Sequence, residues 1–180
     1  MRKAAENGNF AGVWAALGAA LLFGLSTPFS KILLGAMPPF MLAGLLYLGA
    51  GVGLGALHLG VRGKREAKLR RADIPWLAGA VLAGGITGPV LLLYGLLHTP
   101  ASSASLLLNL ECVFTVLLAW LIFRENLDWR VAVGMALIVA GGAALSWEGG
   151  AFAIPLPAIA IAGACLAWGI DNNLTQRASA

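Results

Sequence analysis

The feature of this sequence that most limits its fold is a series of six apolar stretches, each about as long as a helix that crosses a lipid bilayer. Such a helix needs about 20 mainly apolar residues. The stretches are 13–34, 39–60, 74–97, 102–123, 129–147 and 154–174. In lipid, a segment must satisfy its own backbone polar groups, which a helix does. The sequence therefore predicts an all-α integral membrane protein, a polytopic bundle of about six transmembrane helices.

Composition excludes a soluble domain. Charged residues make up 11% of the 180 residues and hydrophobic residues 59%, whereas soluble domains carry about 25% charged residues. The net charge of +4 arises mostly from basic residues between the apolar stretches, so it indicates membrane topology and not a nucleic-acid partner. Cys112 and Cys165 lie inside apolar stretches without metal-ligand spacing, so neither a disulfide framework nor a metal or other cofactor is expected.

The basic residues are distributed very unevenly along the chain. Eleven of the 12 Lys and Arg residues lie in the N-terminus, the second and fourth connections and the chain's end, and only Lys31 lies on the other side. Positive residues mark the cytoplasmic face. We expect a multi-pass protein of the inner (plasma) membrane with a cytoplasmic N-terminus. The basic connection 61–73 serves as the orientation signal or contacts anionic membrane lipids, and Lys31 is expected to extend to the outer interface.

The start of the sixth stretch repeats a pattern from the first. Residues 23–31 (FGLSTPFSK) and 168–176 (WGIDNNLTQ) each place an aromatic-Gly pair before a polar patch. Five apolar stretches separate the two copies, so the second copy is upside down, as in the inverted repeats of secondary transporters. The predicted parts are a cytoplasmic N-terminus (1–12), a five-helix repeat (13–147), and a periplasmic loop with the first helix of a second, truncated repeat (148–180).

Glu111 is the strongest candidate for a functional residue. It lies near the centre of the fourth stretch, where a charge costs at least a few kcal/mol and is expected to face the interior of the bundle. It either couples transport to protons or substrate, or makes a structural hydrogen bond to another helix. Asn109, two positions earlier, is expected to point to a different side and reach a neighbouring helix.

The two copies of the repeat supply further candidates. Phe23, Ser26 and Thr27 of the first copy and Trp168 and Asp171 of the second lie at opposite depths, so they are expected to meet at the interface between the repeats. The alternative is that the sixth helix ends near residue 170 and Asp171 is a cytoplasmic cap. Tyr94 either packs at the membrane interface or lines the pocket.

Glycine and proline indicate close packing and broken helices. Gly49, Gly51, Gly53 and Gly55 lie in the second stretch, and Gly84, Gly85 and Gly88 lie in the third. Small residues let helices approach closely in lipid, either within one chain or across a homodimer. The Gly88-Pro89 pair and Pro28 are expected to bend or open their helices.

Several motifs resemble the EamA-type members of the drug/metabolite transporter superfamily. They are the first-helix pattern ALLFGLSTPF at 20–29, the segment SSASLLLNLECVFTVLLA at 102–119, and FRENL at 123–127 followed by GMALIVAGG at 134–142. The resemblance implies two inverted five-helix halves, usually ten spans in all, around a central cavity, and export or exchange of amino acids, nucleotide precursors and other small metabolites. Two departures stand out: Cys112 replaces a proline common in the family, which removes an expected kink, and the chain stops after one half and one helix.

The sequence as a whole predicts half of an inverted-repeat transporter fold. The expected function is secondary transport, as an efflux permease that exports or exchanges small metabolites or drugs by alternating access, in a truncated or partial chain. The alternative is a non-transporting membrane scaffold, or a half-carrier that functions only as a dimer. An enzyme is not expected, because the sequence holds no paired catalytic constellation.

Overall fold

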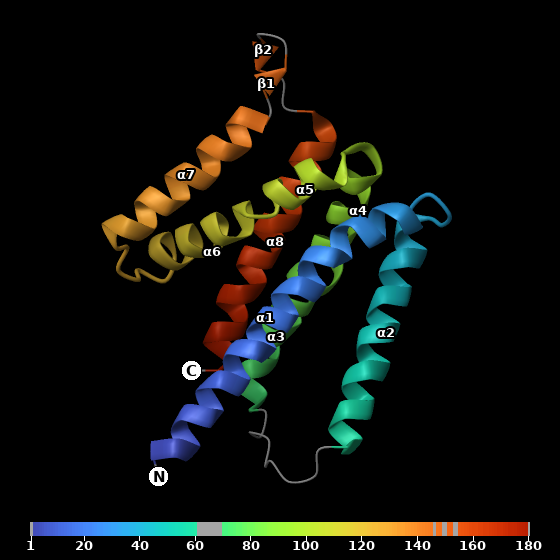
Figure 1. Ribbon diagram of the computed structural model, residues 1–180. Helices are drawn as coiled ribbons and strands as arrows, with labels where there is room; N and C mark the ends of the chain where they lie inside the picture. Colours follow the sequence, from blue (N-terminus) through green and yellow to red (C-terminus); the bar gives the residue numbers. More distant parts are fainter. Residues whose placement is uncertain (1, 61–69, 146, 149–150, 153–154, 180) are drawn as a thin grey trace.

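The computed structural model describes residues 2–60, 70–145, 147–148, 151–152 and 155–179, and it is almost entirely helical (Figure 1). The elements in chain order are α1 (Arg2–Leu33), α2 (Pro39–Gly60), the 3₁₀ turn η1 (Arg71–Asp73), α3 (Ile74–Ala80), the π-helical segment η2 (Val81–Thr87), α4 (Gly88–His98), α5 (Ala101–Leu107), α6 (Leu110–Leu121), α7 (Trp129–Leu145), the strands β1 (Trp147–Glu148) and β2 (Ala151–Phe152), and α8 (Leu156–Ser179). The two short strands pair as an antiparallel hairpin between α7 and α8. The predicted all-α membrane bundle is confirmed.

Helices occur at all six of the predicted positions. Four of them are long and apolar enough to cross a membrane: Gly12–Leu33, Pro39–Gly60, Arg71–His98 and Ala101–Leu121. The apolar helix Trp129–Ala144 is shorter. In α8 the polar run from Asp171 to Asn173 lowers the hydropathy of an otherwise apolar helix of 24 residues.

The last helix, α8, occupies the middle of the bundle (Figure 1). It packs against α3, η2 and α4 on one side and against α5 and α6 on the other, while α1 packs on α5 and α4, α2 on α4, and α7 on α6 and α5. Leu93, Leu96, Ile161 and Cys165 are fully buried between α4, α8 and their neighbours. The helices α1 and α8 run in opposite directions, so the start of α1 and the end of α8 lie at the same end of the bundle.

A row of glycines brings the third span into close contact with α8. The four glycines and the α8 residues that a Cβ at each would meet are Gly79 with Leu174, Gly84 with Asp171, Gly88 with Trp168, and Gly95 with Ile161. Along the third span, each successive glycine meets an α8 residue nearer the start of α8, so the two helices are antiparallel. This confirms close packing within the chain for Gly84 and Gly88.

The glycines of α2 behave differently. A Cβ added at Gly49, Gly51, Gly53 or Gly55 would meet nothing within 4 Å. The interpretation that these glycines let α2 pack closely against other helices is therefore wrong for the described part of the chain. Gly49 and Gly53 lie on one side of α2 and Gly51 and Gly55 on nearly the opposite side, and both sides are open to lipid or to another protein.

Two of the membrane helices are interrupted. The third span widens into η2 directly before Gly88-Pro89, as expected, because proline supplies no backbone donor to the preceding turn. The helix α1, by contrast, continues through Pro28 without a break.

The fourth span also breaks, at Leu108 and Asn109, between α5 and α6. Two i to i−3 hydrogen bonds tighten the chain here, from Asn109 N to Leu106 O at 3.2 Å and from Glu111 N to Leu108 O at 3.1 Å. The expectation that Cys112, in place of proline, leaves this span unkinked is therefore wrong. The break lies one turn earlier and needs no proline.

Candidate functional site

Glu111 lies in the first turn of α6 and is half buried. The Asn172 amide of α8 donates a hydrogen bond of 3.0 Å to its Oε1 atom and lies 3.3 Å from the Thr115 hydroxyl. No Lys, Arg or His among the described residues forms an ion pair with this carboxylate. The predicted contact with another helix is present, and its partner is an uncharged amide.

The neighbouring amide, that of Asn173, fastens α8 to α6. Its side chain is 4% exposed and donates to Thr115 O at 3.0 Å and to Gly169 O at 2.8 Å. Gly169 permits this approach, because a Cβ there would lie 3.0 Å from Thr115 N. A buried amide needs such partners, so Asn173 and Gly169 together set the position of Asn172 beside Glu111. The sequence places both asparagines in the polar patch 171–173 of the sixth stretch, but of that patch only Asp171 is a predicted site residue.

A cavity of about 290 Å³ separates α1 from the broken α5–α6 helix. Its lining consists of Phe23, Gly24, Thr27, Ser105, Leu108, Asn109, Glu111 and Cys112. The break in the helix brings Asn109 and Glu111 to the same cavity, contrary to the expectation that they point to different sides. The Asn109 amide donates to Ser105 O and Leu106 O of its own turn and not to a neighbouring helix.

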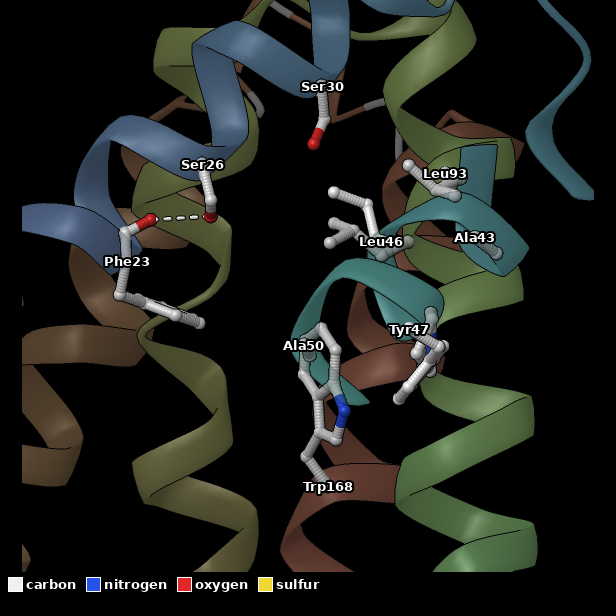
Figure 2. Close-up of a pocket in the computed structure, with 11 residues that line it drawn as sticks. Phe23, Ser26, Ser30, Ala43, Leu46, Tyr47, Ala50, Leu93 and Trp168 are labelled. Atoms are coloured by element: carbon white, nitrogen blue, oxygen red, sulfur yellow. Dashed lines mark hydrogen bonds between the residues drawn. The ribbon is translucent and has the colours of Figure 1, made fainter. Parts of the chain in front are cut away.

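A second cavity, of about 210 Å³, lies among α1, α2, α4 and α8 (Figure 2). It is lined by Phe23, Ser26, Ser30, Ala43, Leu46, Tyr47, Ala50, Pro89, Leu92, Leu93 and Trp168. In Figure 2, Phe23, Ser26 and Ser30 on α1 face Tyr47 and Trp168 across the space.

Three polar side chains of this second cavity, those of Ser26, Tyr47 and Trp168, bond to backbone carbonyls. The Trp168 indole donates to Gly84 O at 3.0 Å, and the Tyr47 hydroxyl lies 3.4 Å from the same oxygen. The Ser26 hydroxyl donates to Phe23 O at 2.6 Å. Because Phe23 lines both cavities, it separates the Glu111 cavity from the Trp168 cavity.

The two repeat patches therefore meet through Phe23, Ser26 and Trp168. Asp171 lines neither cavity: its carboxylate lies against Gly84 and accepts a hydrogen bond of 3.1 Å from Thr175. It is nevertheless inside α8, which runs to Ser179, so the alternative that the helix ends near residue 170 is wrong.

Two other polar residues lie away from both cavities. Tyr94 is 45% exposed and makes an edge contact with His98, with 6.0 Å between the ring centroids. The Lys31 ammonium donates to Leu96 O and Leu97 O at the end of α4. Lys31 therefore caps the negative end of a helix. That this end lies at the outer interface stays a prediction.

The chemistry available here is that of one ionisable carboxyl group beside a cavity. The residues that the structure describes hold no group of three or more His, Cys, Asp or Glu that could bind a metal ion. The first cavity offers space between α1 and the α5–α6 helix, and the second among α1, α2, α4 and α8.

Comparison with known proteins identifies the family. The model of the EamA-like transporter family matches residues 10–147. The chain belongs to the EamA-like transporter family. It is thus a multi-pass membrane protein of a transporter family, as the motifs of the first and fourth helices indicated.

Two relatives in this family share about a third of their aligned residues with the chain. An uncharacterized transporter from Methanothermobacter thermautotrophicus is 33% identical over 175 residues, which cover 88% of this chain and 51% of that protein. A probable terminal-alkyne amino-acid exporter from Streptantibioticus cattleyicolor is 31% identical over 121 residues, covering 67% of this chain and 40% of that protein. The chain spans about half the length of these relatives or less. No solved structure matches it.

Proposed function

We propose that this chain forms the first five-helix repeat, and the first helix of the second, of a secondary transporter that exports or exchanges small metabolites across the inner membrane with its N-terminus in the cytoplasm. The observation that carries the proposal is the position of Glu111. It lies in the middle of a membrane-spanning helix, beside a cavity, and bonds to the helix that begins the inverted copy. Intramembrane carboxylates of this kind mark ion and substrate pathways.

In the proposed mechanism, Glu111 carries the coupling proton. Deprotonated Glu111 accepts the Asn172 hydrogen bond and holds α8 against α6. Protonation removes the charge that strengthens this bond, so the Asn172 contact weakens and α8 can shift against α6 about the bond that Asn173 keeps. Because Trp168 is on the same helix and lines the second cavity, this movement reshapes the substrate cavity and supplies one half of an alternating-access cycle.

The second cavity supports a small amphipathic substrate. Its walls are mainly aliphatic and aromatic, and its polar groups are hydroxyls and one indole. Few polar groups on apolar walls are typical of small-molecule sites. One of the two relatives is named a probable terminal-alkyne amino-acid exporter, and this name supports a small amino acid as the substrate. Transport, and not catalysis, is the proposed activity.

The test is export by inverted membrane vesicles supplied with radiolabelled amino acids and a proton gradient. We expect Glu111→Gln to abolish gradient-driven accumulation while exchange without a gradient remains. Cys112→Ala is the matched control, because Cys112 lines the same cavity without a charge. Gradient-driven accumulation by Glu111→Gln equal to that of the unchanged protein would refute the coupling role.

A second candidate is a half-carrier that functions only as a dimer. The side of α2 that carries Gly51 and Gly55 favours it, because a Cβ at either position would meet nothing within 4 Å and small residues promote helix association in lipid. If the chain is a monomer, membrane lipids cover this side of α2. Gly51→Leu would weaken such a dimer, and mass photometry of the protein in nanodiscs would measure the change.

A further inference from the structure

A third cavity lies where the end of α8 meets the connection between α6 and α7. It measures about 230 Å³ and is lined by Phe123, Glu125, Asn173, Gln176 and Arg177. Two of its lining residues, Gln176 and Arg177, are in the last turns of α8. This cavity is polar, unlike the aliphatic and aromatic Trp168 cavity.

The cavity holds two opposite charges that do not pair with each other. Among the described residues, Glu125 and Arg177 form no ion pair. Glu125 accepts a hydrogen bond of 3.1 Å from the Gln176 amide, and Cζ of the Arg177 guanidinium lies over the Phe123 ring, 5.2 Å from its centroid. A guanidinium carries five N–H donors in a planar fork, which matches a carboxylate in two-point geometry.

The local fold explains why Glu125 lies at this cavity. The helix α6 ends in a turn in which Arg124 has a φ of 55° and Glu125 N donates to Ala119 O at 3.1 Å. This bond closes a seven-residue turn at the helix C-terminus, where a left-handed residue, here Arg124, is normally glycine. The turn reverses the chain and places Glu125 beside α8, where Gln176 holds its carboxylate. At the base of the cavity, the buried Asn173 fixes α8 against α6.

We propose that this cavity is a loading subsite for the zwitterionic head group of an α-amino acid. Arg177 binds the carboxylate, Glu125 binds the ammonium group, and the Phe123 ring contacts the aliphatic side chain. Two unpaired opposite charges on one small cavity fit a ligand that carries both charges better than a cation or an anion. The inference rests on the proposed export function, and it names the substrate class.

The position of the subsite suits a first encounter before transport. Nine residues of α8 separate Arg177 from Trp168, about 13 Å along a helix. An amino acid released from the subsite therefore has a short path along α8 to the Trp168 cavity. The orientation expected from the basic residues places the subsite on the cytoplasmic side, where an exporter takes up its substrate.

Binding of three related ligands to the purified protein in nanodiscs, measured by isothermal titration calorimetry, tests the proposal. The ligands are L-leucine, its methyl ester, which lacks the carboxylate, and N-acetyl-L-leucine, which lacks the ammonium group. We expect leucine to bind most tightly. Arg177→Gln should weaken leucine binding about tenfold or more, as expected for one lost charge-assisted contact, and leave the ester unaffected. Glu125→Gln should likewise weaken leucine binding and leave N-acetyl-leucine unaffected.

Arg130→Gln is the matched control. Arg130 has the same charge as Arg177 and also stacks on an aromatic ring, that of Trp129 at 5.8 Å, but it does not line the cavity. The control should bind all three ligands as the unchanged protein does. Absence of leucine binding, or variants that leave the ligand preference unchanged, would overturn the subsite.

The same ligands separate the subsite from the export function. If leucine binds with the expected pattern but inverted vesicles do not accumulate it, the subsite stands and the proposed export fails. If vesicles accumulate leucine and both variants bind it normally, the exporter stands and the subsite is wrong.

Discussion

Replacing Gly95 by alanine tests whether close contact between α4 and α8 holds the bundle together. A Cβ at this position would lie 2.5 Å from Cγ1 of Ile161 and 2.6 Å from the carbonyl oxygen of Pro157, whereas carbon atoms in contact normally lie about 3.5–4.0 Å apart. Ile161 is fully buried and the carbonyl is backbone, so neither can move aside alone. The two helices must therefore separate by about 1 Å.

The expected cost follows from two opposing effects. Overpacking a tight core costs about 1–3 kcal/mol, and alanine recovers up to about 1 kcal/mol through its higher helix propensity. We expect Gly95→Ala to lower the free energy of unfolding by about 1–2 kcal/mol. Gly53→Ala is the matched control, because a Cβ there meets nothing within 4 Å, so only the propensity gain of up to about 1 kcal/mol applies.

The assay is unfolding of the purified variants in mixed micelles, titrated with sodium dodecyl sulfate and followed by circular dichroism. The reasoning requires Gly95→Ala to unfold at a lower detergent fraction than the unchanged protein, and Gly53→Ala at an equal or higher fraction. If Gly95→Ala is as stable as Gly53→Ala, the glycine row does not set the distance between α4 and α8.

Three further predictions address individual contacts. Lys31→Met leaves two carbonyls at the end of α4 without their cationic donor and should lower stability in the same titration by about 1–3 kcal/mol; equal stability would show that the contact is dispensable. Trp168→Phe removes the indole donor to Gly84 O but keeps an aromatic ring, so hydrogen exchange in Val81–Thr87 should become faster, and unchanged exchange would contradict a role for this bond in holding η2. N-ethylmaleimide should modify the exposed Cys112 before the buried Cys165, as read by mass spectrometry; equal rates would contradict the burial of Cys165.

Much of the helical architecture follows from patterns within single segments. Apolar length predicts where the helices lie, and Gly88-Pro89 predicts the opening of the third span, because both effects act within a few residues. The break at Leu108 and Asn109 was missed because it uses no proline. It rests on a side-chain amide that bonds to its own preceding turn, and an asparagine in a helix does so only in some contexts.

The partners of the polar groups were harder to predict. Glu111 and Asn172 are 61 positions apart, and their contact depends on Gly169 admitting α6 to the surface of α8. Lys31 finds its acceptors in Leu96 and Leu97, at the end of a helix that only the tertiary fold brings close. Sequence patterns identify such groups as unusual in a membrane helix, but the choice among partners requires the arrangement of the helices.

The π-helical segment η2 sets the rotation of α4 about its own axis. Gly79 and Gly84 are five residues apart and yet both face α8, whereas in an uninterrupted α-helix five residues would point about 140° apart. The wider turn of a π-helix removes this difference. Deleting one residue between Gly79 and Gly84 would restore α-helical winding and give the four glycines the spacing 4, 4 and 7, which is that of one α-helical face, so Gly88 and Gly95 would still face α8. The same deletion in the uninterrupted α4 would turn the rest of that helix by about 100°. The π-helical segment thus lets the third span hold one residue more than its contact face requires without turning α4 away from α8.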